Sequence, residues 1–589
     1  MPLSELEDAV LKDCPMDAAW SLVKTFSTLQ RCEPAGVDAG AEVIVERARA
    51  LNLPITIHRP EIYLSIPQDA SVAIGGKRFR AKPPALSRPI PNGHRAPAIY
   101  MQANMKNLRV YTKDIRTIFA ADGLDPDTLA DRIVGRILVT EGFGNPALTA
   151  LVQEMGAAGL VVINPGNNIH WGTSSTIWGS PGLSDLDRAP TIPVVAVNKT
   201  DGKEIRDAVQ RGGEITLTSE LTEGWFPQSI PVVEIPAGHP DAAEDPDAFL
   251  LVHGHYDSWE VGVGDNATGD ATLLALAAAL WENRAHLRRS VRVAWWPGHS
   301  TGRYAGSTWY ADHFALDLAR NCVATINCDS PGCRWATTYR KLTCMTEMRG
   351  FVAQAVQDAT GKTPEFLRPK RAGDASFLNL GISSYYSLSS TMSEGALAEK
   401  EYYEVSGCGG NIAWHTEDDV MDVADREVFE TDVRLYTLSV LRHAVARVVP
   451  GEWRATVSEF RETLAGYKSA AKGAGNWRTA EEATDALDIA LKQLGDAIDT
   501  GVVTPASANH LHREIARVLV RVNFSREGQF AQDPAFACPA LPGLSVAAEA
   551  APDLAGHRNA AVDLQRGLNA YAASLEGAVR TIMMVLPAG

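Results

Sequence analysis

The chain has 589 residues, 45% of them apolar and 21% charged, which is typical of a soluble globular protein with several domains. Its formal net charge of −16 argues against nucleic acid or an anionic membrane surface as a partner. No stretch reaches the roughly 18 uninterrupted apolar residues of a membrane-spanning helix, and the acidic N-terminal segment lacks the apolar core of a secretory signal. We therefore expect a cytoplasmic protein whose eight cysteines, none in a C-x-x-C pair, are reduced thiols.

The first 222 residues suggest two units. Residues 15–57 follow a helical pattern and end in a strand, and residues 58–104 are rich in Pro and Gly and suggest short strands and loops. We assign residues 1–104 to the N-terminal part of the main domain. Apolar strands and helix-like segments then alternate from about 105 to 222, which predicts a separate small α/β domain.

A strong α/β pattern occupies residues 223–451, where the apolar strands FLLVHGHYD, SVRVAWWP and VATINCDS alternate with helical segments. From residue 452 to residue 589 the strand signals vanish and long amphipathic segments replace them. The sequence therefore predicts a main α/β domain over 223–451 and a helical domain over 452–589.

Four candidate metal ligands follow predicted strands of the main domain. His255 ends a buried strand, with Asp257 two residues later on the same face, and Asp265 lies in the Gly-bounded loop GDNATG. Asp329 follows another strand in NCDSPG, and His415 precedes an acidic turn in AWHTEDD. Each of them alone has a structural explanation, as a strand end or a helix cap. Together, two His and two Asp without thiolate suit one or two zinc ions, with manganese or iron as alternatives.

The segments HGHYDSW, GDNATG, NCDSPG and WHTEDD, in that order, resemble motifs of the co-catalytic zinc metallopeptidase family. This family includes bacterial aminopeptidases, glutamate carboxypeptidase and the transferrin-receptor branch. The resemblance covers nearly the whole chain. It implies an α/β fold in which a mixed-sheet catalytic domain carries an inserted protease-associated domain, 105–222, and a C-terminal helical dimerisation domain, 452–589.

Carried over by position, the resemblance also implies roles for the candidate ligands. A first metal is held by His255, Asp265 and Asp329. Asp265 bridges to a second metal that His415 also binds, and Asp257 supports His255. The peptide bond that follows Asp265 is expected to be cis, as it is in relatives.

The chain departs from the family in the stretch WWPGHSTGRYAGS. The family places two adjacent glutamates here, one as the general base and one as a ligand of the second metal. This chain has His299 and Ser300 at these positions, or Ser300 and Thr301 in a shifted alignment. The usual base and the carboxylate ligand of the second metal are therefore both missing from this stretch.

His299 is the residue that we expect to fill the gap. Gly298 and Gly302 bracket it and permit a tight backbone that points its side chain inward. Because neutral imidazole is a good ligand for zinc, iron and manganese, we predict that His299 holds one metal together with Asp265 and His415. A weaker variant makes His299 the general base, and a loop histidine bonded to backbone is the structural alternative.

The segment RPKRAGDASF occupies the place where relatives build their specificity pocket. Arg368, Lys370 and Arg371 are candidates for binding a substrate carboxylate, and a solvated basic loop is the alternative interpretation. Trp414 replaces the tyrosine that the family usually has before its last histidine, and we expect it to contact substrate.

The function that these features favour is a metal-dependent hydrolase, similar to aminopeptidases and carboxypeptidases. It would cleave an amide or peptide-like bond in a small molecule or short peptide, and a substrate that bears a carboxylate is one candidate. Two alternatives stay open. One is a non-catalytic receptor or scaffold on the same fold, which the missing glutamates favour. The other is a metal enzyme of another reaction type, such as a lyase or an oxygen-using enzyme.

The C-terminal helices generate the first prediction, because their apolar stripes exceed what one bundle face needs and relatives pair through this domain. We predict a homodimer that buries well over ~2,000 Å² through residues 452–589. Light scattering at micromolar concentration should give the mass of two chains. The mass of a single chain would contradict the prediction.

Overall fold

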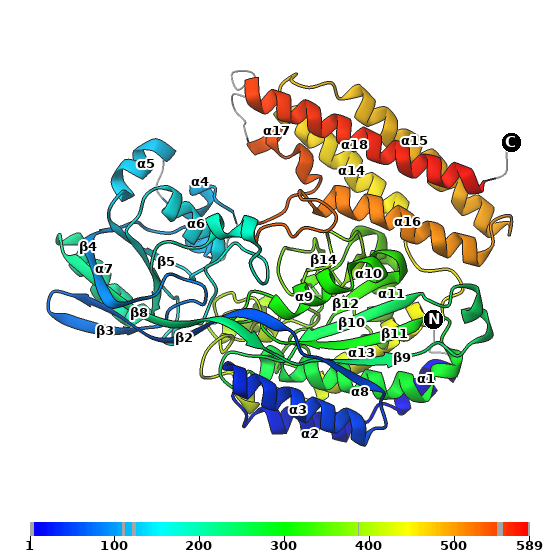
Figure 1. The fold of residues 1–589 in the computed structure, drawn as a ribbon, viewed down its shortest axis with the longest axis horizontal. Coiled ribbons are helices and arrows are strands. Elements are labelled where there is room, and N and C mark those ends of the chain that lie inside the picture. Colours follow the sequence, from blue (N-terminus) through cyan, green and yellow to red (C-terminus); the bar gives the residue numbers. More distant parts are fainter. Residues whose placement is uncertain (1–4, 109–111, 121–124, 387, 550–557, 587–589) are drawn as a thin grey trace.

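The computed structural model describes residues 5–108, 112–120, 125–386, 388–549 and 558–586 (Figure 1). A six-stranded sheet forms the centre of the main domain, and its strand order is β1-β9-β11-β10-β12-β15. Strands β11, β10, β12 and β15 run parallel, whereas β9 is antiparallel to both β1 and β11. The strands are β1 Ile55–His58, β9 Ile230–Ile235, β10 Phe249–His255, β11 Ser290–Trp296, β12 Cys322–Asn327 and β15 Ser383–Tyr385. The predicted mixed α/β fold is thus confirmed.

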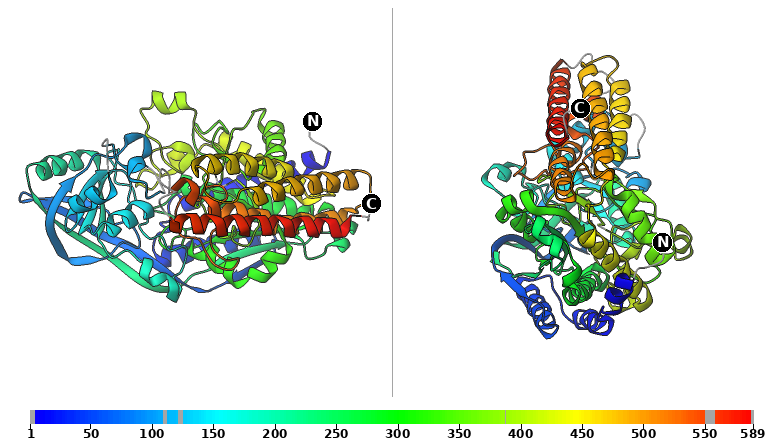
Figure 2. Two further views of the ribbon diagram at one scale, coloured as in Figure 1. Left: turned by 90° about the horizontal axis from the view of Figure 1, so that it is seen from above. Right: turned by 90° about the vertical axis from the view of Figure 1, so that its right-hand side faces the viewer.

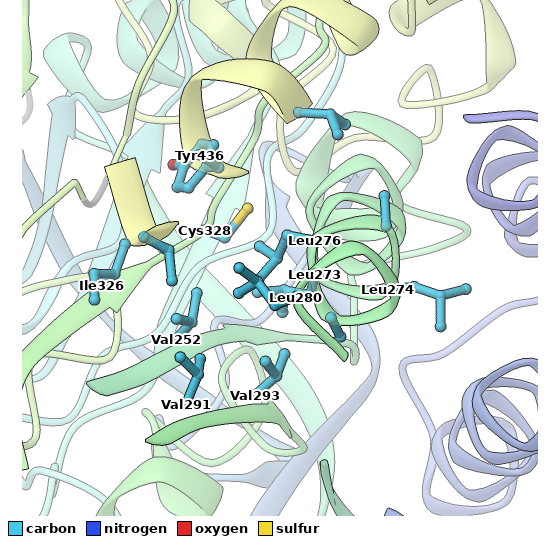
Figure 3. Packing of buried hydrophobic residues seen from close by; sticks show 14 of the residues in the cluster. Val252, Leu273, Leu274, Leu276, Leu280, Val291, Val293, Ile326, Cys328 and Tyr436 are labelled. Atoms are coloured by element: carbon cyan, nitrogen blue, oxygen red, sulfur yellow. The ribbon is translucent and has the colours of Figure 1, made fainter. Parts of the chain in front are cut away.

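The central strands are apolar on both faces because helices cover the sheet from both sides. One face packs against α8 (Thr268–Glu282), which is buried along almost its whole length. Figure 3 shows Leu273, Leu276 and Leu280 of this helix facing the valines of β10 and β11. The same layer contains α1 Glu5–Lys12, α2 Met16–Phe26, α3 Pro34–Ala50, α11 Arg349–Thr360 and α13 Arg426–Val445. The opposite face packs against α9 Ala305–His313 and α10 Ala315–Asn321.

A second sheet has seven strands in the order β3-β2-β8-β4-β5-β6-β7. Its strands are β2 Glu61–Ile74, β3 Lys77–Ala81, β4 Ile90–Tyr100, β5 Ile137–Glu141, β6 Gly159–Ile163, β7 Val194–Val197 and β8 Glu214–Pro227. Its helices are α4 Ile115–Ile118, α5 Pro126–Ile133, α6 Pro146–Glu154 and α7 Lys199–Gln210. This inserted domain therefore extends from β2 to β8 and is wider than the predicted 105–222.

The boundary differs because β2, β3 and β4 lie within the 58–104 segment that we assigned to the main domain. Besides β3, strand β2 pairs with β8, about 150 residues later in the chain, and the Pro- and Gly-rich composition of the segment gives no sign of this pairing. The inserted domain stands at one end of the molecule (Figure 1). Its kinship with protease-associated domains stays a prediction.

The C-terminal region is helical, as predicted. Its long helices lie side by side in a bundle above the main domain (Figure 2). They are α14 Trp453–Ala470, α15 Arg478–Asp499, α16 Pro505–Phe524 and α18 Arg558–Val585, with the short α17 Val546–Glu549 between the last two. The remaining short elements are α12 Glu394–Glu399, β13 Leu342–Thr343 and β14 Phe366–Leu367. Among the helices of the described residues, none combines the length and apolar character needed to cross a membrane.

A buried guanidinium joins the bundle to the main domain. Arg517 of α16 is 8% exposed and donates hydrogen bonds to four backbone carbonyl groups, those of Leu318, Ala319, Cys322 and Gly381. The guanidinium of Arg517 thus binds carbonyl groups at the end of α10, at the start of β12 and in the loop before β15. This contact fixes the position of the bundle over the carboxyl end of α10.

We predict that Arg517→Met lowers the free energy of unfolding by about 3 kcal/mol, because buried carbonyl groups lose their donor. Urea denaturation followed by circular dichroism measures the change. The control is Arg478→Met, which removes an exposed ion pair with Glu482 and should change stability by less than about 0.5 kcal/mol. Equal stability of Arg517→Met and the wild type would show that this contact does not hold the bundle.

Candidate metal centre

The four predicted ligands meet at the carboxyl edge of the central sheet. His255 ends β10, Asp329 follows β12, and Asp265 lies in the loop that leads into α8. His415 comes from the loop before α13 and completes the group. Because parallel strands end at one edge of a sheet, side chains far apart in the sequence gather there.

The carboxylate of Asp265 lies between two imidazole rings. Its Oδ1 is 3.1 Å from Nε2 of His255, and its Oδ2 is 3.1 Å from Nε2 of His415. Oδ2 of Asp329 lies 3.9 Å from the same Nε2 of His255. Donors bound tetrahedrally at zinc distances of 2.0–2.2 Å lie about 3.4 Å apart, so this spacing fits a divalent ion between them.

Backbone contacts fix which nitrogen of each ring faces Asp265. Nδ1 of His255 donates to the carbonyl of Asp257 at 2.8 Å, and Nδ1 of His415 donates to the carbonyl of Trp171 at 3.0 Å. Each Nε2 therefore presents a lone pair to a carboxylate oxygen, which is also an acceptor. Nε2 of His255 is buried and has no hydrogen-bond partner among the described residues. Acceptors that face one another in this way need a cation, so the donor set fits a bound metal.

Charge interactions within the group act in the same direction. Burial lowers the pKa of His255, but the adjacent carboxylate of Asp265 outweighs it and raises the pKa well above its usual value. The pKa of Asp265 is correspondingly held well below its usual value, because the two imidazoles outweigh its burial. Burial and the charge of Asp265 raise the pKa of Asp329 to about 6. The charges of the group therefore favour a cation between His255 and Asp265.

Asn266 ties the ligand loops together. Its Nδ2 donates to the carbonyl groups of His255 and Cys328, and its Oδ1 accepts the backbone N–H of Ser330. The peptide bond between Asp265 and Asn266 is cis, as the resemblance implied. One buried amide thus connects the ends of β10 and β12 to the loop that carries the bridging carboxylate.

Asp257 does not support His255 through its carboxylate, as the resemblance implied. Its Oδ1 lies 4.0 Å from Nδ1 of His255, and it is the backbone carbonyl of Asp257 that accepts from that ring. The carboxylate instead accepts the backbone N–H groups of His299 and Ser300, at 3.0 and 2.8 Å. The side chain of Asp257 is thus directed at the backbone of the loop after β11 and not at the imidazole, and it anchors that loop.

The loop that carries His299 is tightly constrained. Gly298 has φ +69°, and a Cβ on Gly302 would lie 2.8 Å from side chains of Leu64 and Ala305. The inserted domain also holds this loop, since Thr173 Oγ1 donates to the carbonyl of Ser300. The glycines at these two positions thus serve the close packing that the sequence suggested.

His299 contacts a carboxylate that the sequence did not reveal. Its Nδ1 lies 2.7 Å from Oδ2 of Asp374, and its ring stacks on His255 with centroids 3.6 Å apart and planes 16° apart. Donor atoms of His255, His299 and Asp329 all lie within 4.8 Å of one another. Asp265 and His415, with which we grouped His299, are not in this set. The structure therefore places His299 beside the first metal position rather than the second.

A cavity of about 230 Å³ opens onto the candidate ligands and lies between the two α/β domains. Phe143, Trp171 and Thr173 line it from the inserted domain, and His299, Arg303, Lys370, Trp414 and His415 line it from the main domain. Trp414 stacks on His415 with centroids 3.6 Å apart. Lys370 and Trp414 therefore lie where the sequence placed them, at the candidate substrate site.

Arg368 and Arg371 are not at this site, and the alternative of a solvated basic loop is also wrong for them. Arg368 points into the C-terminal bundle, where it pairs with Glu459 and contacts the ring of Phe524. Arg371 is 2% exposed and donates to the carbonyl of Asp533. Both guanidinium groups join the main domain to C-terminal segments, a long-range contact that the local sequence does not reveal.

Comparison with known proteins agrees with this geometry. Residues 234–435 match the model of peptidase family M28. Carboxypeptidase Q of Mus musculus is 27% identical over 134 residues, which are 22% of this chain and 27% of that protein. The chain thus aligns with about a quarter of this curated relative's length.

Two solved structures share the fold. A peptidase M28 precursor from Shewanella amazonensis gives a TM-score of 0.55 at 15% identity, over 76% of this chain and 97% of that one. A zinc aminopeptidase from Bacillus subtilis gives 0.50 at 18% identity, over 72% of this chain and 94% of that one. The similarity in fold therefore extends over most of this chain.

The contacts of Asp257 generate a prediction. Asp257→Asn should destabilise the metal-free chain by about 1–3 kcal/mol, because the amide replaces one acceptor oxygen by a donor that faces a backbone N–H group. Metal affinity should change by less than the 10–100-fold expected for a residue that orients a ligand, since a carbonyl already orients His255. Urea denaturation and competition with a chelator measure the two effects. A large loss of metal affinity at unchanged stability would restore the role that the resemblance implied.

Proposed function

We propose that this chain is a metal-dependent hydrolase of an amide or peptide-like bond in a small substrate, because residues 234–435 match the model of peptidase family M28. The observation that carries the proposal is the pair of imidazole lone pairs that face the Asp265 carboxylate within a cavity. Buried acceptors directed at one another would destabilise the fold of a metal-free receptor or scaffold, so their presence favours a metal-binding protein.

Zinc is the ion that we propose for this site, and manganese or iron would accept the same donors. His255, Asp265 and Asp329 offer three protein ligands at the first position, which is the usual number in a catalytic zinc site. The second position has Asp265 and His415. A metal bound at the first position supplies a Lewis acid that polarises the scissile carbonyl and acidifies a water molecule.

His299 replaces one of the glutamates that the family uses, as a base or as a ligand. Its ring lines the cavity beside His255 and Asp329, so both roles are within reach of the reacting atoms. The charge-neutral imidazole leaves the site more positive than a glutamate would, which favours an anionic or carbonyl-bearing group in the cavity.

The substrate that fits is a small amide or a short peptide with a carboxylate. The cavity lies between two domains, and the cationic side chains of Lys370 and Arg303 line it together with Trp414. Arginine and lysine bind carboxylates by charge-assisted hydrogen bonds, and the indole supplies an apolar wall. These residues support a substrate of this class.

Metal removal tests the proposal. The isolated protein should contain at least one zinc per chain, and His255→Ala or Asp329→Ala should lose it because each removes one of three ligands. Chelation should lower the free energy of unfolding by about 3 kcal/mol if the site is about 100-fold saturated. Zinc content by plasma mass spectrometry and thermal melting measure both effects.

Turnover is measured on amino-acid 4-nitroanilides and on N-acyl amino acids with free or amidated carboxyl groups. The free acids should be the better substrates, and chelation should abolish their cleavage. A protein without metal that melts at the same temperature with and without chelator would be a scaffold. Redox-active iron with no amide cleavage would indicate another reaction type.

A further inference from the structure

We propose that Asp374 is a positioning residue that makes His299 the general base of this site and keeps it from serving as a metal ligand. The inference deepens the proposed function and rests on it. Asp374 lies in the loop between β14 and β15 and was not among the residues that the sequence analysis singled out.

The contacts of Asp374 fix the tautomer of His299. Asp374 is 1% exposed, and its Oδ1 accepts from Oγ of Ser307 at 2.6 Å. Its Oδ2 lies 2.7 Å from Nδ1 of His299 and accepts the proton of that nitrogen. Oγ of Ser376 lies 2.9 Å from Oγ of Ser307 and extends the network. With Nδ1 protonated, the lone pair of His299 is on Nε2.

The ring of His299 is held in one orientation. Its backbone N–H is bound by Asp257, so the residue is anchored at both the main chain and the side chain. One face stacks on His255, and the ring of Tyr304 approaches edge-on with centroids 4.7 Å apart. A base that is fixed in this way pays little entropy when it meets a water molecule in the cavity.

Stacking on His255 argues against a metal shared by the two rings, although their donor atoms lie close together. A ligating nitrogen directs its lone pair within the plane of its ring, at a metal distance of about 2.0–2.1 Å. The two rings lie nearly parallel, at 16°, and their centroids are 3.6 Å apart. A metal held in the plane of His255 would therefore be poorly directed toward a lone pair of His299. His299 is therefore close to the metal position, but its lone pair is not directed at it. This arrangement suits a general base beside the metal and not a second imidazole ligand.

His299 and Asp374 form a dyad that transfers protons during hydrolysis. Nε2 of His299 takes a proton from water while the water oxygen forms a bond to the substrate carbonyl carbon. The resulting imidazolium is stabilised by the Asp374 carboxylate at Nδ1, which keeps its own negative charge. The proton then passes to the departing nitrogen as the C–N bond breaks, and the products are a carboxylic acid and an amine. The dyad thus supplies the carboxylate charge that the family places directly at the water.

The test compares His299→Ala and Asp374→Asn with the metal-loaded wild type. Both variants should keep the wild-type zinc content, whereas Asp329→Ala should lose it. On the amide that the wild type cleaves best, each variant should lower kcat by about 10³-fold with little change in KM. His299→Ala removes the base, and the asparagine of Asp374→Asn stabilises the wrong tautomer of His299. The double variant should be no slower than either single variant, since the two residues act as a unit.

The control is Glu347→Gln, which changes a buried carboxylate bonded to the hydroxyl groups of Ser383 and Thr456, away from the site. It should turn over at the wild-type rate. If Asp374→Asn fails to fold, Ser307→Ala removes one donor to the same carboxylate and should lower kcat by about tenfold. Loss of a zinc in His299→Ala, or wild-type turnover by Asp374→Asn, would overturn the proposal.

A second readout does not require turnover. Diethyl pyrocarbonate acylates the unprotonated imidazole nitrogen, and mass spectrometry of the peptide that carries His299 gives the rate at this residue. Asp374→Asn should slow this reaction at least tenfold, because the lone pair moves from Nε2 to Nδ1. If the wild type cleaves no test amide, the proposed hydrolase fails, while this rate still decides the tautomer. Equal rates in the two proteins would contradict the role of Asp374.

Discussion

The Asp265 carboxylate, which faces the lone pairs of two imidazoles, is the interaction on which the rest of the structure depends. Buried acceptors that face one another destabilise the fold when no cation lies between them, so contacts of the surrounding chain must keep them in place. The parallel strands β10 and β12 deliver His255 and Asp329 at one edge of the sheet, and Asn266 links their ends to the bridging loop. The fold thus maintains a site that is stable when a metal is bound.

The inserted domain contributes directly to this site. The carbonyl of Trp171 fixes the tautomer of His415, and the backbone N–H of Trp171 donates to the carbonyl of His415 in return. Thr173 holds the loop that carries His299. The cavity is closed by residues of both domains, so a change in their relative position would change ligand geometry and substrate access together.

The candidate ligands could be predicted from sequence because His255 and Asp329 follow apolar strands, Asp265 lies in a Gly-bounded loop and His415 precedes an acidic turn. Their motifs also come in a recognisable order. The position of His299 after β11 was also apparent, together with the glycines that shape its loop. The contact with Asp374 was not, because 75 residues separate the two in the chain and no local pattern marks a loop carboxylate as a partner. Arg368 and Arg371 were misplaced for the same reason. Their partners belong to C-terminal segments, which spacing within the loop does not reveal.

The measurement that tests the account most directly is a crystal structure with anomalous scattering recorded at the zinc absorption edge. The account predicts a metal bound by His255, Asp265 and Asp329, with His299 hydrogen-bonded to Asp374 and its Nε2 more than about 3 Å from the ion, well beyond a zinc–nitrogen bond. A metal bound directly by Nε2 of His299, or a site that holds no metal when crystallised with zinc, would contradict it.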